Sequence, residues 1–94
     1  MLHLIFQLPV LQAVLDRISM GDDVVFLDNA VYQLQQGGVL NDKILKMAEE
    51  NINLYALKDE LEVRSVDVDN YVSIMSYSDL VELTEKNKLI KSWN

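Results

Sequence analysis

The chain has 94 residues, of which half are apolar, and its formal net charge is −7. This length predicts one domain spanning residues 1–94, with a small core that buries roughly 60–65% of the unfolded surface. Only 8 basic residues face 15 acidic ones and no basic stripe is present, so direct binding to nucleic acid is not expected.

Cysteine is absent from the sequence, which excludes disulfides, cysteine-based metal sites and thiol chemistry within these 94 residues. The apolar N-terminal segment has no basic region before it and no small-residue cleavage site, so we expect no signal peptide. No apolar run approaches the length of a membrane span. We therefore expect a cytoplasmic protein without a membrane segment.

The first part of the chain predicts a strand followed by a helix. Residues 2–6 form an apolar run that is too short for a helix, which indicates a buried strand. Pro9 suits the first turn of the following helix, and Gly21 is placed to end it. The residues between them form one apolar stripe at helical spacing: Val10, Leu11, Val14, Leu15 and Ile18.

A second strand and two helices are predicted next. Residues 24–27 are β-branched, aromatic or aliphatic, which favours a buried strand. Asp28 or Asn29 can cap a short helix over residues 30–36, which ends at the two glycines that follow. A further helix is expected to be capped by Asn41. Its apolar face would consist of Ile44, Leu45, Met47 and Ala48.

The remaining part repeats one design, in which a short apolar strand leads directly into a helix. Residues 52–57 predict a strand and residues 58–64 the start of a helix. Residues 71–75 predict the next strand. The spacing of Asp79 and Glu82 is that of a capping box, so the last helix is expected to begin near Ser78 or Asp79. Leu89, Ile90 and Trp93 indicate a final short strand.

The expected order is β-α-β-α-α-β-α-β-α-β, which predicts a mainly parallel sheet covered by helices on both faces. Right-handed crossovers then place the helices in two layers. Sheets of this kind bind ligands at the carboxyl ends of their strands. Those ends are expected at Gln7, Leu8, Asp28, Asn29, Lys58, Asp59, Ser76, Tyr77 and Ser78.

The residue types present offer little material for catalysis. Nucleophilic catalysis needs a base beside the nucleophile, and the single histidine, His3, lies at the amino end of its strand, opposite the usual site edge. We interpret it as a structural residue with a neighbour or water as its partner. A carboxylate metal site from Asp22, Asp23 and Asp28 is conceivable, but the first two are more simply explained as a solvated turn. We assign no catalytic, cofactor-binding or metal-binding residue.

Four aromatic residues divide into two pairs. Tyr55 and Tyr71 lie within predicted strands and are expected in the core. Tyr77 follows a strand directly, and Trp93 lies in the final strand. Either can anchor an interface or cap the core, because aromatic side chains are favoured in both settings.

Several segments, in order and at matching spacing, give the chain a resemblance to the DsrH/TusB family of the DsrE-like fold. The resemblance covers nearly the whole length. Its carriers are Met1-Leu2-His3, the segment from Gly21 to Tyr32, Tyr55-Ala56-Leu57 with Asp59, Leu61 and Arg64, and Tyr77, Val81, Leu83-Thr84 and Ser92-Trp93. Two positions depart from the family pattern. Ser65 stands where the family usually has glycine, and Asn29-Ala30 where it usually has Asp-Gly.

The resemblance implies a three-layer DsrE-like fold with a central, mainly parallel five-stranded sheet and helices on both faces. It also implies a role in sulfur relay, in which a subunit of this kind joins TusC/DsrF-like and TusD/DsrE-like subunits in a hetero-hexamer. One branch of the family supports 2-thiolation of the wobble uridine of tRNA, and the other serves sulfur oxidation. The carrier cysteine lies chiefly on the TusD/DsrE-like subunit. A chain without cysteine cannot hold a persulfide, which favours a non-catalytic TusB-like role without a cofactor.

Two other hypotheses belong to different classes. The chain can be a stand-alone homo-oligomeric module that holds a small ligand at the strand ends. It can also be an enzyme that uses carboxylates near Asp28 and Asp59, although no base with a tuned pKa is evident.

Overall fold

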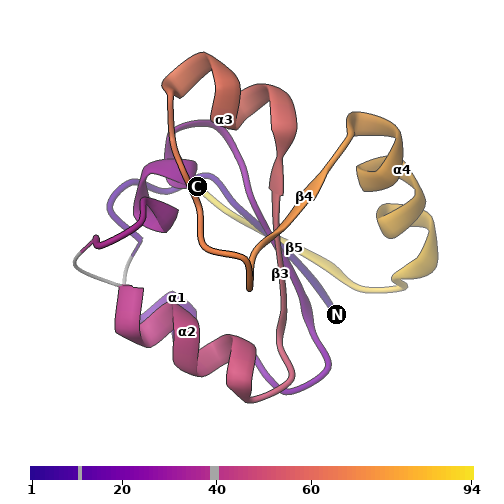
Figure 1. The fold of residues 1–94 in the computed structure, drawn as a ribbon. Coiled ribbons are helices and arrows are strands. Elements are labelled where there is room, and N and C mark those ends of the chain that lie inside the picture. Colours follow the sequence, from indigo (N-terminus) through magenta and orange to yellow (C-terminus); the bar gives the residue numbers. More distant parts are fainter. Residues whose placement is uncertain (11, 39–40) are drawn as a thin grey trace.

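A parallel five-stranded sheet forms the centre of the molecule (Figure 1). The computed structural model describes residues 1–10, 12–38 and 41–94. Neighbouring strands are parallel throughout, in the order β4-β3-β2-β1-β5. The strands are β1 (Leu2–Ile5), β2 (Asp23–Phe26), β3 (Asn53–Leu57), β4 (Ser73–Met75) and β5 (Ile90–Trp93). The predicted fold class and the predicted order of elements are both confirmed.

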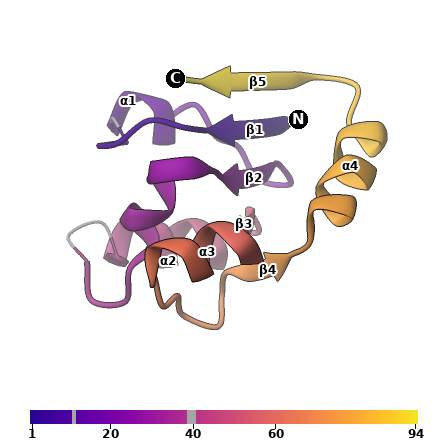
Figure 2. The same ribbon diagram turned by 90° about the horizontal axis from the view of Figure 1, so that it is seen from above.

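The helices cover the two faces of the sheet unequally. They are α1 (Gln12–Leu15), the 3-10 helix η1 (Asp28–Leu34), α2 (Asn41–Glu49), α3 (Lys58–Arg64) and α4 (Tyr77–Lys86). From β1 to β4 the chain moves one strand at a time in one direction, so right-handed crossovers keep their helices on one face. The connection from β4 to β5 returns past three strands. Its helix, α4, therefore lies on the opposite face (Figures 1 and 2).

Two hydrophobic clusters follow from this arrangement, one on each face. The alternation of side chains along β2 shows the division, because Val24 and Phe26 belong to the larger cluster and Val25 and Leu27 to the smaller one. The larger cluster also contains the buried residues of α1, η1, α2 and α3. Among the described helices, only α4 covers the smaller cluster, through Leu80 and Leu83.

The N-terminal helix differs from its prediction. The described part of α1 is a single turn, so Pro9 lies outside it and Gly21 does not end it. Past the helix the chain tightens into i to i+3 hydrogen bonds, which still bury the predicted apolar stripe. Gly21, with φ +87°, instead forms the turn before β2. The buried members of the stripe are Val10, Val14, Leu15 and Ile18, whereas Leu11 lies outside the described residues.

The residue pair after β2 also differs from its prediction. The cap position of η1 is held by Leu27, which offers no side-chain cap, and Asp28 is the first residue of the helix with φ +53°. The carboxylate of Asp28 pairs with Arg64 on α3 instead of capping the backbone. The predicted cap of α2 was Asn41, which is the first residue of that helix and whose side chain is not among those described.

The two strand-to-helix segments match their predictions in order but differ in some of their bounds. Strand β4 begins at Ser73 and not at residue 71. Helix α3 covers residues 58–64 and begins where predicted, with Asp59 and Glu60 in its first turn, where the helix dipole favours negative charge. Helix α4 begins earlier than predicted. Its capping box is formed by Ser76 and Asp79, so the prediction that Asp79 and Glu82 form it was wrong.

Candidate functional site

The carboxyl ends of β3 and β4 form a switch point in the sheet. The two strands are neighbours, but α3 leaves β3 toward one face and α4 leaves β4 toward the other (Figure 1). A crevice is expected outside the strand ends at such a point. A hollow of about 240 Å³ lies there, lined among others by Lys58, Asp59, Ser76 and Tyr77, which were predicted to gather at this edge.

A larger groove adjoins this hollow, between the strand ends and α4, and we call it the α4 groove. Its volume is about 440 Å³. The lining comes from the ends of β1, β2 and β3, from the start of α3 and from one side of α4. Its apolar members are Leu4, Phe6, Leu27, Leu57, Tyr77, Leu80 and Val81, and its polar members are Asp28, Glu60 and Thr84. The size lies within the range of small-molecule sites.

A network around Arg64 closes one side of this edge. The guanidinium donates hydrogen bonds to the carboxylates of Asp28 and Glu60 and to the side-chain oxygen of Asn29. The planar fork of arginine suits such multiple contacts, which connect α3 to η1. Sequence reasoning placed Asp28 at this edge but did not find its partner, because the two residues are 36 positions apart.

Other residues of the predicted edge have separate positions. The amide of Gln7 donates to the backbone carbonyl of Asn94 at 2.8 Å, on the side of β5. Tyr77 is 70% exposed, so its ring does not cap the core. Phe6 lines the α4 groove and was not predicted as a site residue, since its apolar neighbours in β1 gave it the signature of a buried strand.

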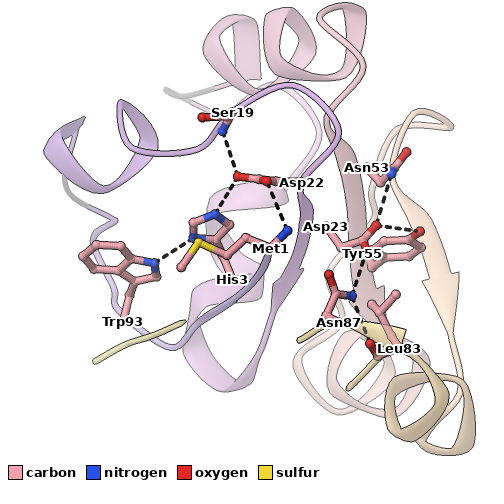
Figure 3. Close-up of polar contacts among 10 residues, drawn as sticks. All are labelled: Met1, His3, Ser19, Asp22, Asp23, Asn53, Tyr55, Leu83, Asn87 and Trp93. Atoms are coloured by element: carbon pink, nitrogen blue, oxygen red, sulfur yellow. Dashed lines mark hydrogen bonds and ion pairs between the residues drawn. The ribbon is translucent and has the colours of Figure 1, made fainter. Parts of the chain in front are cut away.

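The amino edge of the sheet holds the histidine in a closed network (Figure 3). His3 is buried, and its Nδ1 accepts from the indole N–H of Trp93 at 3.2 Å. Because an indole nitrogen only donates, the ring proton of His3 lies at Nε2, which donates to Asp22 at 2.9 Å. Asp22 also accepts from the backbone N–H of Ser19 and from the N-terminal ammonium of Met1. Both nitrogens of His3 are therefore occupied by protein partners, as its structural interpretation predicts.

The three aspartates considered for a metal site are not brought together. The side chain of Asp23 accepts hydrogen bonds from Asn53 and Asn87 at 3.1 Å each (Figure 3). Asp22 is held in the histidine network, and Asp28 lies beyond the other end of β2. Within the described residues, no group of three or more His, Cys, Asp or Glu is arranged to hold a metal ion. The interpretation of Asp22 and Asp23 as a solvated turn was wrong for Asp23, which is buried at the start of β2.

The contacts of the remaining aromatic residues show which of them pack on the core and which lies at the surface. Tyr55 lies in β3 as predicted, whereas Tyr71 lies in the turn before β4 and not in the strand predicted for it. Both side chains are partly buried and pack against the clusters. Burial, together with the nearby Asp23 carboxylate, raises the pKa of the Tyr55 phenol above its ordinary 10.0. Trp93 packs on the larger cluster and stacks on His3, with ring centroids 6.3 Å apart. Trp93 therefore caps the core, whereas Tyr77 is left at the surface.

The arrangement at the carboxyl edge suits binding, and several of its polar side chains are engaged in structural contacts. The hydroxyl of Ser76 accepts from the backbone N–H of Asp79 as a helix cap. The carboxylates of Asp28 and Glu60 are held by Arg64. The single histidine, His3, is buried at the opposite edge. What the edge does offer is an apolar groove with exposed aromatic and aliphatic side chains.

Comparison with known proteins places the chain in a family. The sequence profile of the DsrH like protein family matches residues 5–89. The chain belongs to the DsrH-like family. Its relatives include a protein named TusB from Erwinia tasmaniensis, 31% identical over 99% of this chain and all of that one. Another protein named TusB, from Serratia proteamaculans, is 33% identical over 88% of this chain and 86% of that one.

The fold of this DsrH-like chain also has a solved counterpart. A protein of unknown function from Methanobacterium thermoautotrophicum superimposes with a TM-score of 0.78 at 12% identity, over 98% of this chain and 96% of that chain. At this identity the likeness concerns the fold alone. The structure holds no helix, among the residues it describes, with the length and apolar character to cross a membrane.

The two departures from the family's glycine pattern have different structural outcomes in this DsrH-like chain. Ser65 has φ +52° and ψ +44°, the left-handed conformation that ends α3 and that glycine adopts without cost. Ala30 is fully buried within η1 and is not among the residues with positive φ. The positive φ of that turn is taken by Asp28 instead. Only Ser65 therefore carries a conformational cost from the replacement.

Proposed function

We propose that this DsrH-like chain is a non-catalytic subunit of a sulfur relay complex that supports 2-thiolation of the wobble uridine in tRNA. The observation that carries the proposal is family membership over nearly the whole chain, together with relatives named TusB. None of the 94 residues is a cysteine, so the sulfur would be held by another subunit. The carboxyl edge supports this division of labour, since it presents a groove and an exposed tyrosine, while its serine Ser76 caps helix α4.

The partners in this proposal are a TusC/DsrF-like and a cysteine-bearing TusD/DsrE-like subunit, in a cytoplasmic hetero-hexamer with two copies of each. A small core makes such assembly physically reasonable, because a domain of this size stabilises itself with little surplus. Twelve large apolar side chains are exposed on the described surface, among them Tyr77 and Val81 on α4. The net charge of −7 makes direct tRNA contact by this chain unfavourable, so tRNA recognition would belong elsewhere.

Co-expression tests the assembly directly. The chain would be produced with TusC-like and TusD-like subunits from the same genome, purified through a tag on the TusD-like subunit, and examined by native mass spectrometry. A complex with equal numbers of all three subunits is expected. A chain that stays behind while the other two subunits purify together would contradict the proposal.

The wobble uridine distinguishes the two branches of the family. Deleting the gene should lower the 2-thiouridine content of the affected tRNAs, measured by liquid chromatography and mass spectrometry of digested tRNA. A plasmid copy of the cysteine-free chain should restore the modification. Unchanged thiolation, with a defect in the oxidation of reduced sulfur compounds instead, would assign the chain to the sulfur-oxidation branch.

A further inference from the structure

The face of the sheet that carries α4 is incompletely covered. In the described part of the chain, a single ten-residue helix packs on this face, whereas α1, η1, α2 and α3 lie on the other (Figures 1 and 2). The floor of the α4 groove is buried, but its walls are not. Phe6 is 37% exposed, Val81 43% and Tyr77 70%. These three side chains come from two separate elements and converge on one groove, which distinguishes them from isolated surface apolar residues.

The charges around the groove select among possible occupants. The charged residues of its lining, Asp28 and Glu60, are both carboxylates, and the single guanidinium of Arg64 pairs with both. This side of the molecule therefore keeps a negative charge after pairing, within a chain of net charge −7. Two copies facing each other through this groove would bring like charges together. A partner with basic groups beside an apolar side chain would complement both the negative charge and the apolar walls of the groove.

We propose that the α4 groove is the docking surface for a partner subunit that inserts an apolar side chain flanked by lysine or arginine. This inference rests on the proposed function, because it assigns a surface to the assembly described above. Phe6, Tyr77 and Val81 form the apolar contact, and the carboxylates of Asp28 and Glu60 attract the basic flank. Exposed aromatic and aliphatic side chains around a buried floor are typical of the centre of an interface.

Two substitutions of Thr84 form a matched pair that tests the electrostatic attraction between the groove and the basic partner. Its side chain lines the groove, and its hydroxyl donates to the backbone carbonyl of Val81 within the same helix. Thr84→Lys and Thr84→Glu both lose this bond and both lengthen the side chain, so they differ chiefly in charge. Thr84→Lys is expected to weaken binding of the purified TusC-like and TusD-like pair roughly tenfold. Thr84→Glu should weaken it by less than about threefold.

Substitutions of Val81 and Val63 form a second matched pair, which tests the apolar contact in the groove. Val63 is 79% exposed on α3, on the opposite side of the sheet. Val81→Asn should lower the affinity for the same pair roughly tenfold, and Val63→Asn should leave it unchanged. Affinity would be measured by titration calorimetry at two salt concentrations. The wild-type affinity should be lower at the higher salt concentration, because salt screens the attraction between exposed charges. Circular dichroism and the urea midpoint of each variant verify that it is folded.

The outcomes separate this inference from the proposed function. Wild-type affinity for Val81→Asn and Thr84→Lys would overturn the docking surface while leaving the sulfur relay role intact. Equal losses of affinity for Thr84→Lys and Thr84→Glu would overturn the inference that the partner is basic. A dimer of the isolated chain that Val81→Asn dissociates would show that a second copy occupies the groove. A wild-type chain that does not bind the pair at all would overturn both proposals.

Discussion

Replacing Ser65 with glycine is expected to stabilise the protein. Ser65 ends α3 with φ +52° and ψ +44°, and the backbone N–H groups around it follow the pattern of a Schellman cap. Ser65 N–H donates to Glu62, and Val66 N–H donates to Leu61 at 3.0 Å. A left-handed conformation costs a residue with a Cβ about 1–2 kcal/mol, and glycine avoids this cost.

The net gain is smaller than the local strain. Glycine loses more backbone entropy on folding than other residues, which costs about 0.5–1 kcal/mol. The free energy of unfolding should therefore rise by about 0.5–1 kcal/mol for Ser65→Gly, when both terms are combined. In a domain of this size the melting temperature would increase by about 3–6 °C.

Urea unfolding followed by circular dichroism measures the effect, with two control variants. Ser65→Ala keeps the Cβ in the left-handed conformation, so its midpoint should stay close to that of the wild type. Glu62→Gly places glycine in the interior of α3, where it should lower stability by about 1 kcal/mol. A midpoint for Ser65→Gly that equals or falls below the wild-type value would refute the reasoning, because it would mean that the left-handed residue carries no removable strain.

Three further predictions concern the polar networks. Hydrogen bonds from Ser19, His3 and the N-terminal ammonium outweigh the opposing effect of burial and lower the pKa of Asp22 below 3.8. This carboxylate therefore stabilises the fold above its unfolded pKa, and the contribution is lost as the pH falls through its folded pKa. The stability deficit of Asp22→Asn should accordingly shrink below about pH 4 in urea titrations, and a deficit independent of pH would contradict the assignment. His3→Phe leaves the indole N–H of Trp93 without its acceptor, so the free energy of unfolding should fall by about 1–3 kcal/mol. The fluorescence emission of Trp93 should also shift. An unchanged emission spectrum would argue against the contact. Arg64→Ala should lower the free energy of unfolding by about 1–2 kcal/mol. Arg64→Lys should recover only part of this loss, because an ammonium cannot reproduce the forked contacts of the guanidinium. Full recovery by Arg64→Lys would refute the importance of those forked contacts.

Local signals explain where the sequence predicted the fold well. The start of α3 at Lys58 was predicted correctly because an apolar strand ends at Leu57 and acidic residues follow at once. Two spacings compete at the start of α4. Asp79 lies three residues before Glu82 and three after Ser76, and the end of β4 at Met75 places the cap at Ser76. The local pattern alone does not decide between them.

Tertiary contacts explain most of what could not be predicted. Asp28 has the chemistry of a helix cap, but the distant Arg64 offers its carboxylate a charged partner instead. The α4 groove depends on strand order, since residues from β1, β2 and β3 meet there only after the sheet has formed. The role of Trp93 was open until β5 was placed beside β1, which brings the indole to His3.

The position of β1 between β2 and β5 also has a consequence for how the chain folds. The contacts of β1 with β2 join segments about 20 residues apart, but those with β5, such as Leu2 with Ile90, join the two ends of the chain. Closing so long a loop costs more entropy, so the β1–β5 pairing is expected late in folding. During synthesis one edge of β1 would remain unpaired until Trp93 has been made. The fluorescence of this single tryptophan would then report the moment at which that edge closes.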